Sequence, residues 1–126
     1  MEKPKVLVVD DEEELVEAIS TRLSAEGFEC VAASNGEDGF SRFQAGGIDL
    51  VITDVLMPMS DGFSMVEWIR QVSDVPVIVI TGYERCREPF LSYFPEIKCL
   101  GKPYNSGQLV GLVQAELAGH GSTTAR

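Results

Sequence analysis

Five consecutive acidic residues, Asp10 to Glu14, directly follow the apolar run KVLVV. Two carboxylates about 4 Å apart repel each other by about 4 kcal/mol at the effective dielectric constant of a protein surface. These acids must therefore point apart into water or surround a cation. Three further polar residues, Asp54, Thr81 and Lys102, also follow short apolar runs. If the runs are parallel strands, these side chains lie at one edge of one sheet.

These residue types suit the chemistry of magnesium and phosphate. Mg²⁺ prefers oxygen ligands and is usually held by one or two carboxylates, with waters and phosphate oxygens completing the octahedron. The set lacks the His and Cys ligands that softer metals favour. We expect Asp10 and Asp11 to hold the metal, and Asp54 to be the nucleophile that takes a phosphoryl group. Lys102 would neutralise one phosphoryl oxygen, and the Thr81 hydroxyl would hydrogen-bond another.

Composition narrows the class of protein. The chain has 126 residues, enough for one domain with its own core, and its 44% hydrophobic and 24% charged residues are typical of a folded globular protein. A net charge of −10 would repel a nucleic-acid backbone, and no basic cluster offsets it. No apolar run approaches the roughly 20 residues that a membrane span needs, and the N-terminus lacks the apolar stretch of a signal peptide. We therefore expect a cytoplasmic protein with neither a membrane nor a nucleic-acid partner.

The cysteines and the single histidine offer little chemistry. Cys30, Cys86 and Cys99 are odd in number and lack metal-ligand spacing, which argues against a disulfide framework and a zinc site. We expect free, mostly buried thiols. His120 stands alone near the C-terminus, and we assign it no role.

The spacing of apolar residues alternates between that of strands and that of helices. Continuous β-branched and aliphatic runs predict strands at 5–10, 28–33, 49–53, 76–81 and 97–101. Helices are predicted from Glu12 to Gly27, from Ser34 or Asn35 to Gly46, after Gly62, as one short helix within 83–95, and over Leu109 to Leu117. In the third of these helices, Met65, Ile69 and Val72 are expected to share one buried face.

This alternation predicts an α/β fold, namely a flavodoxin-like, doubly wound, five-stranded parallel sheet in the order 2-1-3-4-5 with helices on both faces. In such sheets ligands bind outside the carboxyl ends of the strands. We expect the domain to cover residues 4–118, and residues 119–126 to be a flexible C-terminal tail or truncated linker.

The sequence resembles the receiver domain of two-component response regulators over about residues 4–118. The motifs that carry the resemblance are VVDDE at 8–12, DVLMPMSDG at 54–62, ITG at 80–82 and GKPY at 101–104.

The resemblance implies that Asp54 accepts a phosphoryl group from a histidine kinase or a histidine phosphotransfer protein, and that Mg²⁺ is the cofactor. It implies metal binding by Asp10, Asp11, Asp54 and the main-chain carbonyl of Leu56, and phosphate-sensing roles for Thr81 and Lys102. It also implies a signalling domain in a phosphorelay, which catalyses only its own phosphorylation and dephosphorylation and acts on a downstream protein effector.

Two departures from the family pattern, at Cys99 and in the segment 83–95, bear on the switch. Receivers usually carry an aromatic residue three positions before the motif lysine, where this chain has Cys99. Tyr83 offers either a shield for the acyl phosphate or an ordinary packed ring. Pro89 and Pro95 interrupt the region of the usual fourth helix. The TGY and KPY variants resemble receivers of hybrid histidine kinases.

Three alternatives stay open at this point. An aspartate-nucleophile phosphatase would need a second acid two residues after Asp54, where Leu56 stands, so no general base is expected to speed hydrolysis. A flavin-binding protein would place a hydroxyl- and glycine-rich phosphate loop after the first strand, where this chain has acids. A binding module could keep the fold but have a weak phosphorylation switch or none, because of Cys99 and the segment 83–95.

Overall fold

The computed structural model describes residues 3–54, 62–82, 92–102 and 104–124. Its strands are β1 (Lys5–Val9), β2 (Glu29–Ala33), β3 (Leu50–Thr53), β4 (Val77–Thr81) and β5 (Lys98–Gly101). Its helices are α1 (Glu13–Ala25), α2 (Gly36–Gln44), α3 (Gly62–Arg70) and α5 (Ser106–Thr124).

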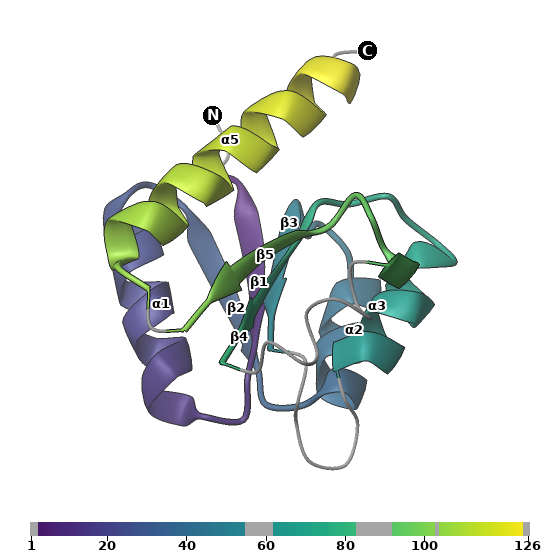
Figure 1. The fold of residues 1–126 in the computed structure, drawn as a ribbon, viewed down its shortest axis with the longest axis horizontal. Helices are drawn as coiled ribbons and strands as arrows, with labels where there is room; N and C mark the ends of the chain where they lie inside the picture. Colours follow the sequence, from purple (N-terminus) through teal and green to yellow (C-terminus); the bar gives the residue numbers. More distant parts are fainter. Residues whose placement is uncertain (1–2, 55–61, 83–91, 103, 125–126) are drawn as a thin grey trace.

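The five strands form one parallel sheet in the order β2-β1-β3-β4-β5 (Figure 1). The predicted fold and strand order are therefore confirmed. Strands alternate with helices along the chain, and because a parallel connection must return to the same end of the sheet, each crossover carries a helix or a long segment. All carboxyl ends of the strands consequently lie at one edge of the sheet.

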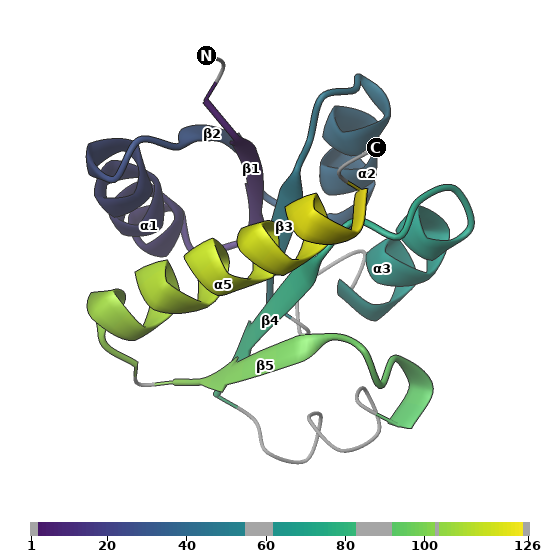
Figure 2. The same ribbon diagram turned by 90° about the horizontal axis from the view of Figure 1, so that it is seen from above.

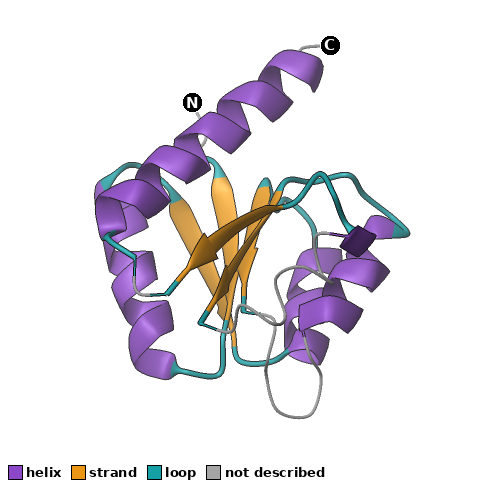
Figure 3. Ribbon diagram, viewed as in Figure 1, coloured by secondary structure: helices purple, strands orange, loops and turns teal. Residues whose placement is uncertain are grey.

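The sheet separates two hydrophobic layers. Figure 2 shows α1 and α5 on one face and α2 and α3 on the other, and Figure 3 shows the strands enclosed between them. Side chains of a strand point alternately to the two faces. Val6 and Val8 accordingly pack with α1 and α5, whereas Leu7 and Val9 pack with α2 and α3. This is why β1 reads as an unbroken apolar run: both of its faces are buried.

Local signals in the sequence set the helix boundaries. Of the two candidate caps for α2, Asn35 takes the role, and its side chain accepts a hydrogen bond from the Asp38 N–H at 2.8 Å. Gly27 follows α1 with φ of 96°, a left-handed conformation that glycine adopts without steric cost. Gly46 does the same after α2, with φ of 98°.

The structure corrects one predicted face. Met65 and Ile69 are fully buried on α3, as expected. Val72 lies beyond the end of that helix at Arg70, and its side chain is 64% exposed. The chain turns away there, with the Val72 N–H donating to the Ile69 carbonyl at 2.9 Å, so helical spacing no longer describes it.

Two further expectations concern the C-terminal half. The helix α5 continues to Thr124, so residues 119–124 are helical where we expected a loose tail, and the domain boundary at 118 stays a prediction. The short helix expected within 83–95 falls largely outside the described residues, although residues 92 and 93 are helical. Across the described part of the chain, no helix combines the length and apolar character needed to cross a membrane.

Candidate functional site

Main-chain hydrogen bonds extend the sheet just far enough to hold the predicted site residues together. The Asp10 N–H donates to the Ala33 carbonyl at 3.1 Å, and the Asp54 N–H donates to the Val9 carbonyl at 3.2 Å. The Lys102 N–H donates to the carbonyl of Thr81 at 2.9 Å. Main-chain hydrogen bonds alone thus hold Asp10, Asp54 and Lys102 at the carboxyl edge of the sheet.

The side chains of three of these residues converge. The Lys102 Nζ lies 3.0 Å from Asp54 Oδ2, a contact that joins positions 48 residues apart, and 3.8 Å from Asp10 Oδ2. Asp10 and Asp54 are only 4% and 6% exposed, whereas the Lys102 side chain is 24% exposed. The ammonium group therefore reaches from the rim onto two buried carboxylates.

Burial and charge shift the ionisation of Asp10. Burial raises its pKa most, while the Glu12 N–H and the Lys102 charge lower it. The Asp54 charge and contact with the Asp11 side chain raise it again, and the result is a pKa of about 6.

Lys102 responds in the opposite sense. Burial, the largest single influence, lowers its pKa, but the hydrogen bond and charge of Asp54, the Asp10 charge and a hydrogen bond to Glu12 together outweigh burial, and the pKa ends above its ordinary value. One ammonium thus serves several carboxylates. The site carries an excess of negative charge that a second cation would relieve.

The donor set fits magnesium through two carboxylates. Asp10 and Asp54 are buried and face one ammonium group, whereas Asp11, the third predicted acid, is exposed. Among the described residues, no three His, Cys, Asp or Glu side chains gather closely enough to enclose an ion. Mg²⁺ usually keeps several waters and needs only one or two protein carboxylates, so this pair meets the requirement.

Thr81 lies at the same edge of the sheet, at the end of β4. It pairs with Gly101 of β5 and is 3% exposed. Leu56 and Tyr83, which the sequence also singled out, lie outside the described residues. The site that the structure describes therefore consists of Asp10, Asp54 and Lys102, with Thr81 buried beside the last of these.

Sequence reasoning missed one contributor, Glu12, which it placed only at the start of the first predicted helix. Its N–H donates to Asp10 Oδ1 at 3.0 Å, and its carboxylate Oε1 lies 3.4 Å from Lys102 Nζ. The sequence signal that could have indicated this contact is the position of Glu12, three residues past the end of β1 and directly before α1.

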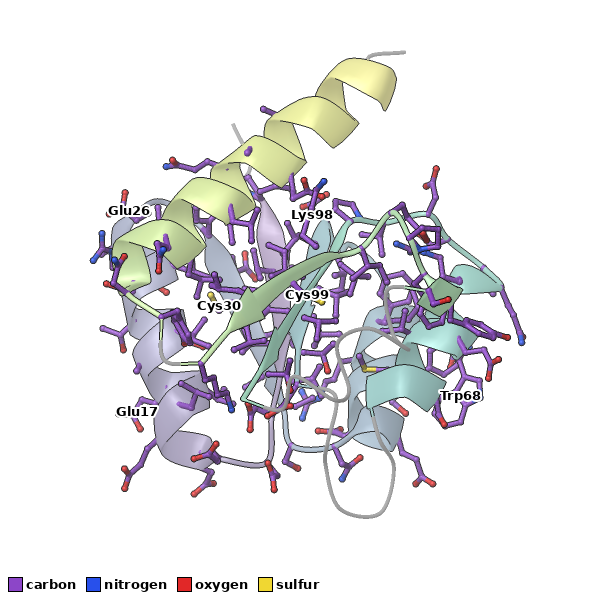
Figure 4. All side chains as sticks on the ribbon, viewed as in Figure 1. Glu17, Glu26, Cys30, Trp68, Lys98 and Cys99 are labelled. Atoms are coloured by element: carbon purple, nitrogen blue, oxygen red, sulfur yellow. The ribbon has the colours of Figure 1, made fainter. Side chains whose placement is uncertain are left out.

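Cys99 sits on β5, close to this site in the sequence but turned into the core. Its side chain is half-buried and packs against the layer of α2 and α3 (Figure 4). Cys30 is a free thiol, half-buried on the other layer, and burial raises its pKa. The free thiol of Cys30 agrees with the prediction from the sequence, although both cysteines are less buried than expected, and Cys86 lies outside the described residues.

Comparison with known families decides the identity of this fold. The family model described as the response regulator receiver domain matches residues 6–114. The chain belongs to the response regulator receiver domain family. Apart from Lys5, the match covers all five described strands and the carboxyl edge where Asp10, Asp54, Thr81 and Lys102 lie.

Sequence relatives of this receiver domain are longer proteins. A probable transcriptional regulator, ycf27, of Guillardia theta is 44% identical over 80 residues, which cover 64% of this chain and 32% of that protein. A CpxR homolog of Haemophilus influenzae, a transcriptional regulatory protein, is 36% identical over 114 residues, which cover 90% of this chain and 50% of that protein. The chain thus spans half or less of the length of these relatives.

Solved structures agree on the fold. The chemotaxis response regulator CheY4 of Vibrio cholerae superposes with a TM-score of 0.82 at 27% identity, covering 90% of this chain and 98% of that one. The receiver domain of the hybrid histidine kinase CckA gives a TM-score of 0.76 at 30% identity, with the same two coverages. The match therefore includes nearly the whole of each neighbour.

Proposed function

We propose that this receiver domain accepts a phosphoryl group on Asp54 from a phosphohistidine, in a Mg²⁺-dependent reaction, and passes the signal to a protein partner in a two-component phosphorelay. The observation that carries the proposal is the 3.0 Å contact between Asp54 Oδ2 and Lys102 Nζ at a buried strand end. A carboxylate with a cation beside it, close to the surface, is suited to attack phosphorus and to hold the product.

The transfer needs only Asp54, the phosphohistidine of the donor and a proton from water. An Asp54 carboxylate oxygen forms a bond to phosphorus while the bond between phosphorus and the donor's imidazole nitrogen breaks. The bonding pair leaves with that nitrogen, which takes up a proton from water, and the product is an acyl phosphate. Proteins assist such transfers mainly by positioning and by stabilising charge on the equatorial oxygens.

The chain supplies that charge through two groups. The Lys102 ammonium, already 3.0 Å from Asp54, would neutralise one phosphoryl oxygen. The hydroxyl of Thr81, which ends the neighbouring strand β4, would donate to another. Removal of Lys102 should therefore weaken the phosphorylated state more than it weakens the fold.

Asp10 and Asp11 would hold magnesium together with Asp54 and the main-chain carbonyl of Leu56. Leu56 lies outside the described residues. When bound, the metal supplies positive charge that allows an anionic donor to approach these acids. Asp10 is prepared for this task, because the Glu12 N–H orients one of its oxygens at 3.0 Å and leaves the other toward the site.

The partners follow from this chemistry. The phosphoryl donor is a histidine kinase or a histidine phosphotransfer protein, and the receiver of the signal is a downstream protein effector, both in the cytoplasm. Under this proposal the domain does not turn over a separate substrate, because it catalyses only its own phosphorylation and dephosphorylation.

The test is phosphorylation by acetyl phosphate with Mg²⁺, followed by intact mass. We expect one added phosphoryl group on the wild type and none on Asp54→Asn. The matched control is Asp74→Asn, the same change at an exposed aspartate before β4, which should label like the wild type. Equal labelling of the wild type and Asp54→Asn would refute the assignment, and an unlabelled wild type would favour the binding module without a switch.

A further inference from the structure

Glu12 joins the site through both its main chain and its side chain. Its N–H donates to Asp10 Oδ1 at 3.0 Å, and its carbonyl accepts from the Val16 N–H at 3.1 Å, so its backbone is fixed between β1 and the first turn of α1. Its side chain makes no capping bond to α1. The carboxylate instead lies 3.4 Å from Lys102 Nζ.

The Lys102 ammonium therefore contacts one buried carboxylate, that of Asp54, and one exposed carboxylate, that of Glu12. Asp54 lies at 3.0 Å with a side chain that is 8% exposed, whereas Glu12 lies at 3.4 Å with a side chain that is 65% exposed. The shorter, drier contact dominates. Glu12 acts on the outer side of the ammonium, where water screens it and its effect is modest.

We propose that Glu12 is a positioning residue for Lys102: its carboxylate draws the ammonium group toward the rim and competes for it with Asp54 and with an incoming phosphoryl oxygen. This inference rests on the proposed function for its kinetic consequence, but the contact itself exists before any phosphoryl group arrives. Glu12 is exposed and also adds negative charge beside the site that an anionic donor must approach. Both effects slow the capture of phosphate.

The kinetic test compares three variants at saturating Mg²⁺, so that changes in metal affinity do not enter. Glu12→Gln should raise the initial rate of labelling by acetyl phosphate about two- to fivefold at low salt, and added salt should shrink the gain because the contact is exposed. Glu13→Gln removes the same charge from the adjacent exposed residue and should change the rate far less. Equal gains in the two variants would overturn positioning in favour of general charge repulsion.

Glu12→Asp separates reach from charge. It keeps the carboxylate but shortens the side chain by one methylene, so it should lose the contact with Lys102 while the negative charge beside the site stays. We expect a gain in rate between those of the wild type and Glu12→Gln. A rate equal to that of the wild type would contradict a role for the contact itself.

A second measurement needs no phosphorylation. In nitrogen-15 NMR of the metal-free protein, the Nζ signal of Lys102 is assigned by its loss in Lys102→Arg. Glu12→Gln and Glu12→Asp should both shift that signal, and Glu13→Gln should leave it in place. An unshifted signal would refute the positioning role even if Asp54 is phosphorylated normally. If the signal shifts but acetyl phosphate does not phosphorylate the protein, only the proposed function is refuted.

Discussion

The central strands and the edge strand β5 differ in depth, and the site is built across that difference. All residues of β3 and β4 are buried, as are all but Lys5 of β1, whereas every residue of β5 is exposed or half-buried. Asp10, Asp54 and Thr81 follow or end central strands and are nearly inaccessible. Lys102 follows β5, and its side chain is 24% exposed. The site therefore combines three buried groups with one partly exposed cation.

Truncation of a core side chain should reveal the difference between the central strands and β5 most strongly. Leu7→Ala removes a fully buried side chain from β1 and should lower the free energy of unfolding by about 3–5 kcal/mol. Leu100→Ala, on β5, removes a half-buried side chain and should cost about 1–2 kcal/mol. Urea unfolding of both variants measures the difference. Equal losses would mean that β5 is packed as firmly as the centre.

Glycine substitution tests the packing of α2 against the centre. A Cβ atom at Gly39 would lie 2.6 Å from Met65 Sδ and 3.0 Å from Val9 Cγ2, so Gly39→Ala should destabilise the fold by about 1–3 kcal/mol. At Gly111 on α5 nothing lies within 4 Å of the added atom, and alanine there should stabilise the helix by about 0.5–1 kcal/mol. Thermal unfolding of the two variants should therefore shift in opposite directions, and a shift in the same direction would contradict this packing.

Magnesium should sharpen the distinction between the buried acids and the partly exposed cation. A ligand at ten times its Kd stabilises the native state by about 1.4 kcal/mol. We expect Mg²⁺ to raise the Tm of the wild type and of Lys102→Met, and to have little effect on Asp10→Asn. The control Asp74→Asn should behave as the wild type. Stabilisation that survives in Asp10→Asn would place the metal elsewhere.

The smallest effect is expected at the surface contact that ties the segment before β5 to α3. Arg70 Nε donates to Glu96 Oε1 at 3.2 Å, and the Glu96 side chain is 55% exposed. Glu96→Gln should change the free energy of unfolding by about 0.5 kcal/mol or less. A loss comparable to that of Leu100→Ala, measured by urea unfolding, would show that this edge depends on the ion pair.

Most of the fold could be predicted because its signals are local. The apolar run of β1, the cap at Asn35 and the glycines after α1 and α2 each act within a few residues. Val72 was predicted wrongly because helical spacing continues past the point where the chain leaves α3. Spacing alone does not mark the end of a helix when no glycine or proline follows it directly.

The sequence by itself determined which strands carry polar residues at their carboxyl ends, because strand periodicity and the rule of parallel crossovers depend on residue type and order. Only the tertiary structure decided that Asp10 is buried while its neighbour Asp11 is exposed, and that the Glu12 side chain reaches Lys102, 90 residues away. The reason is physical. Burial and charge contacts depend on distances between segments, and those distances exist only once the sheet has brought the strand ends together.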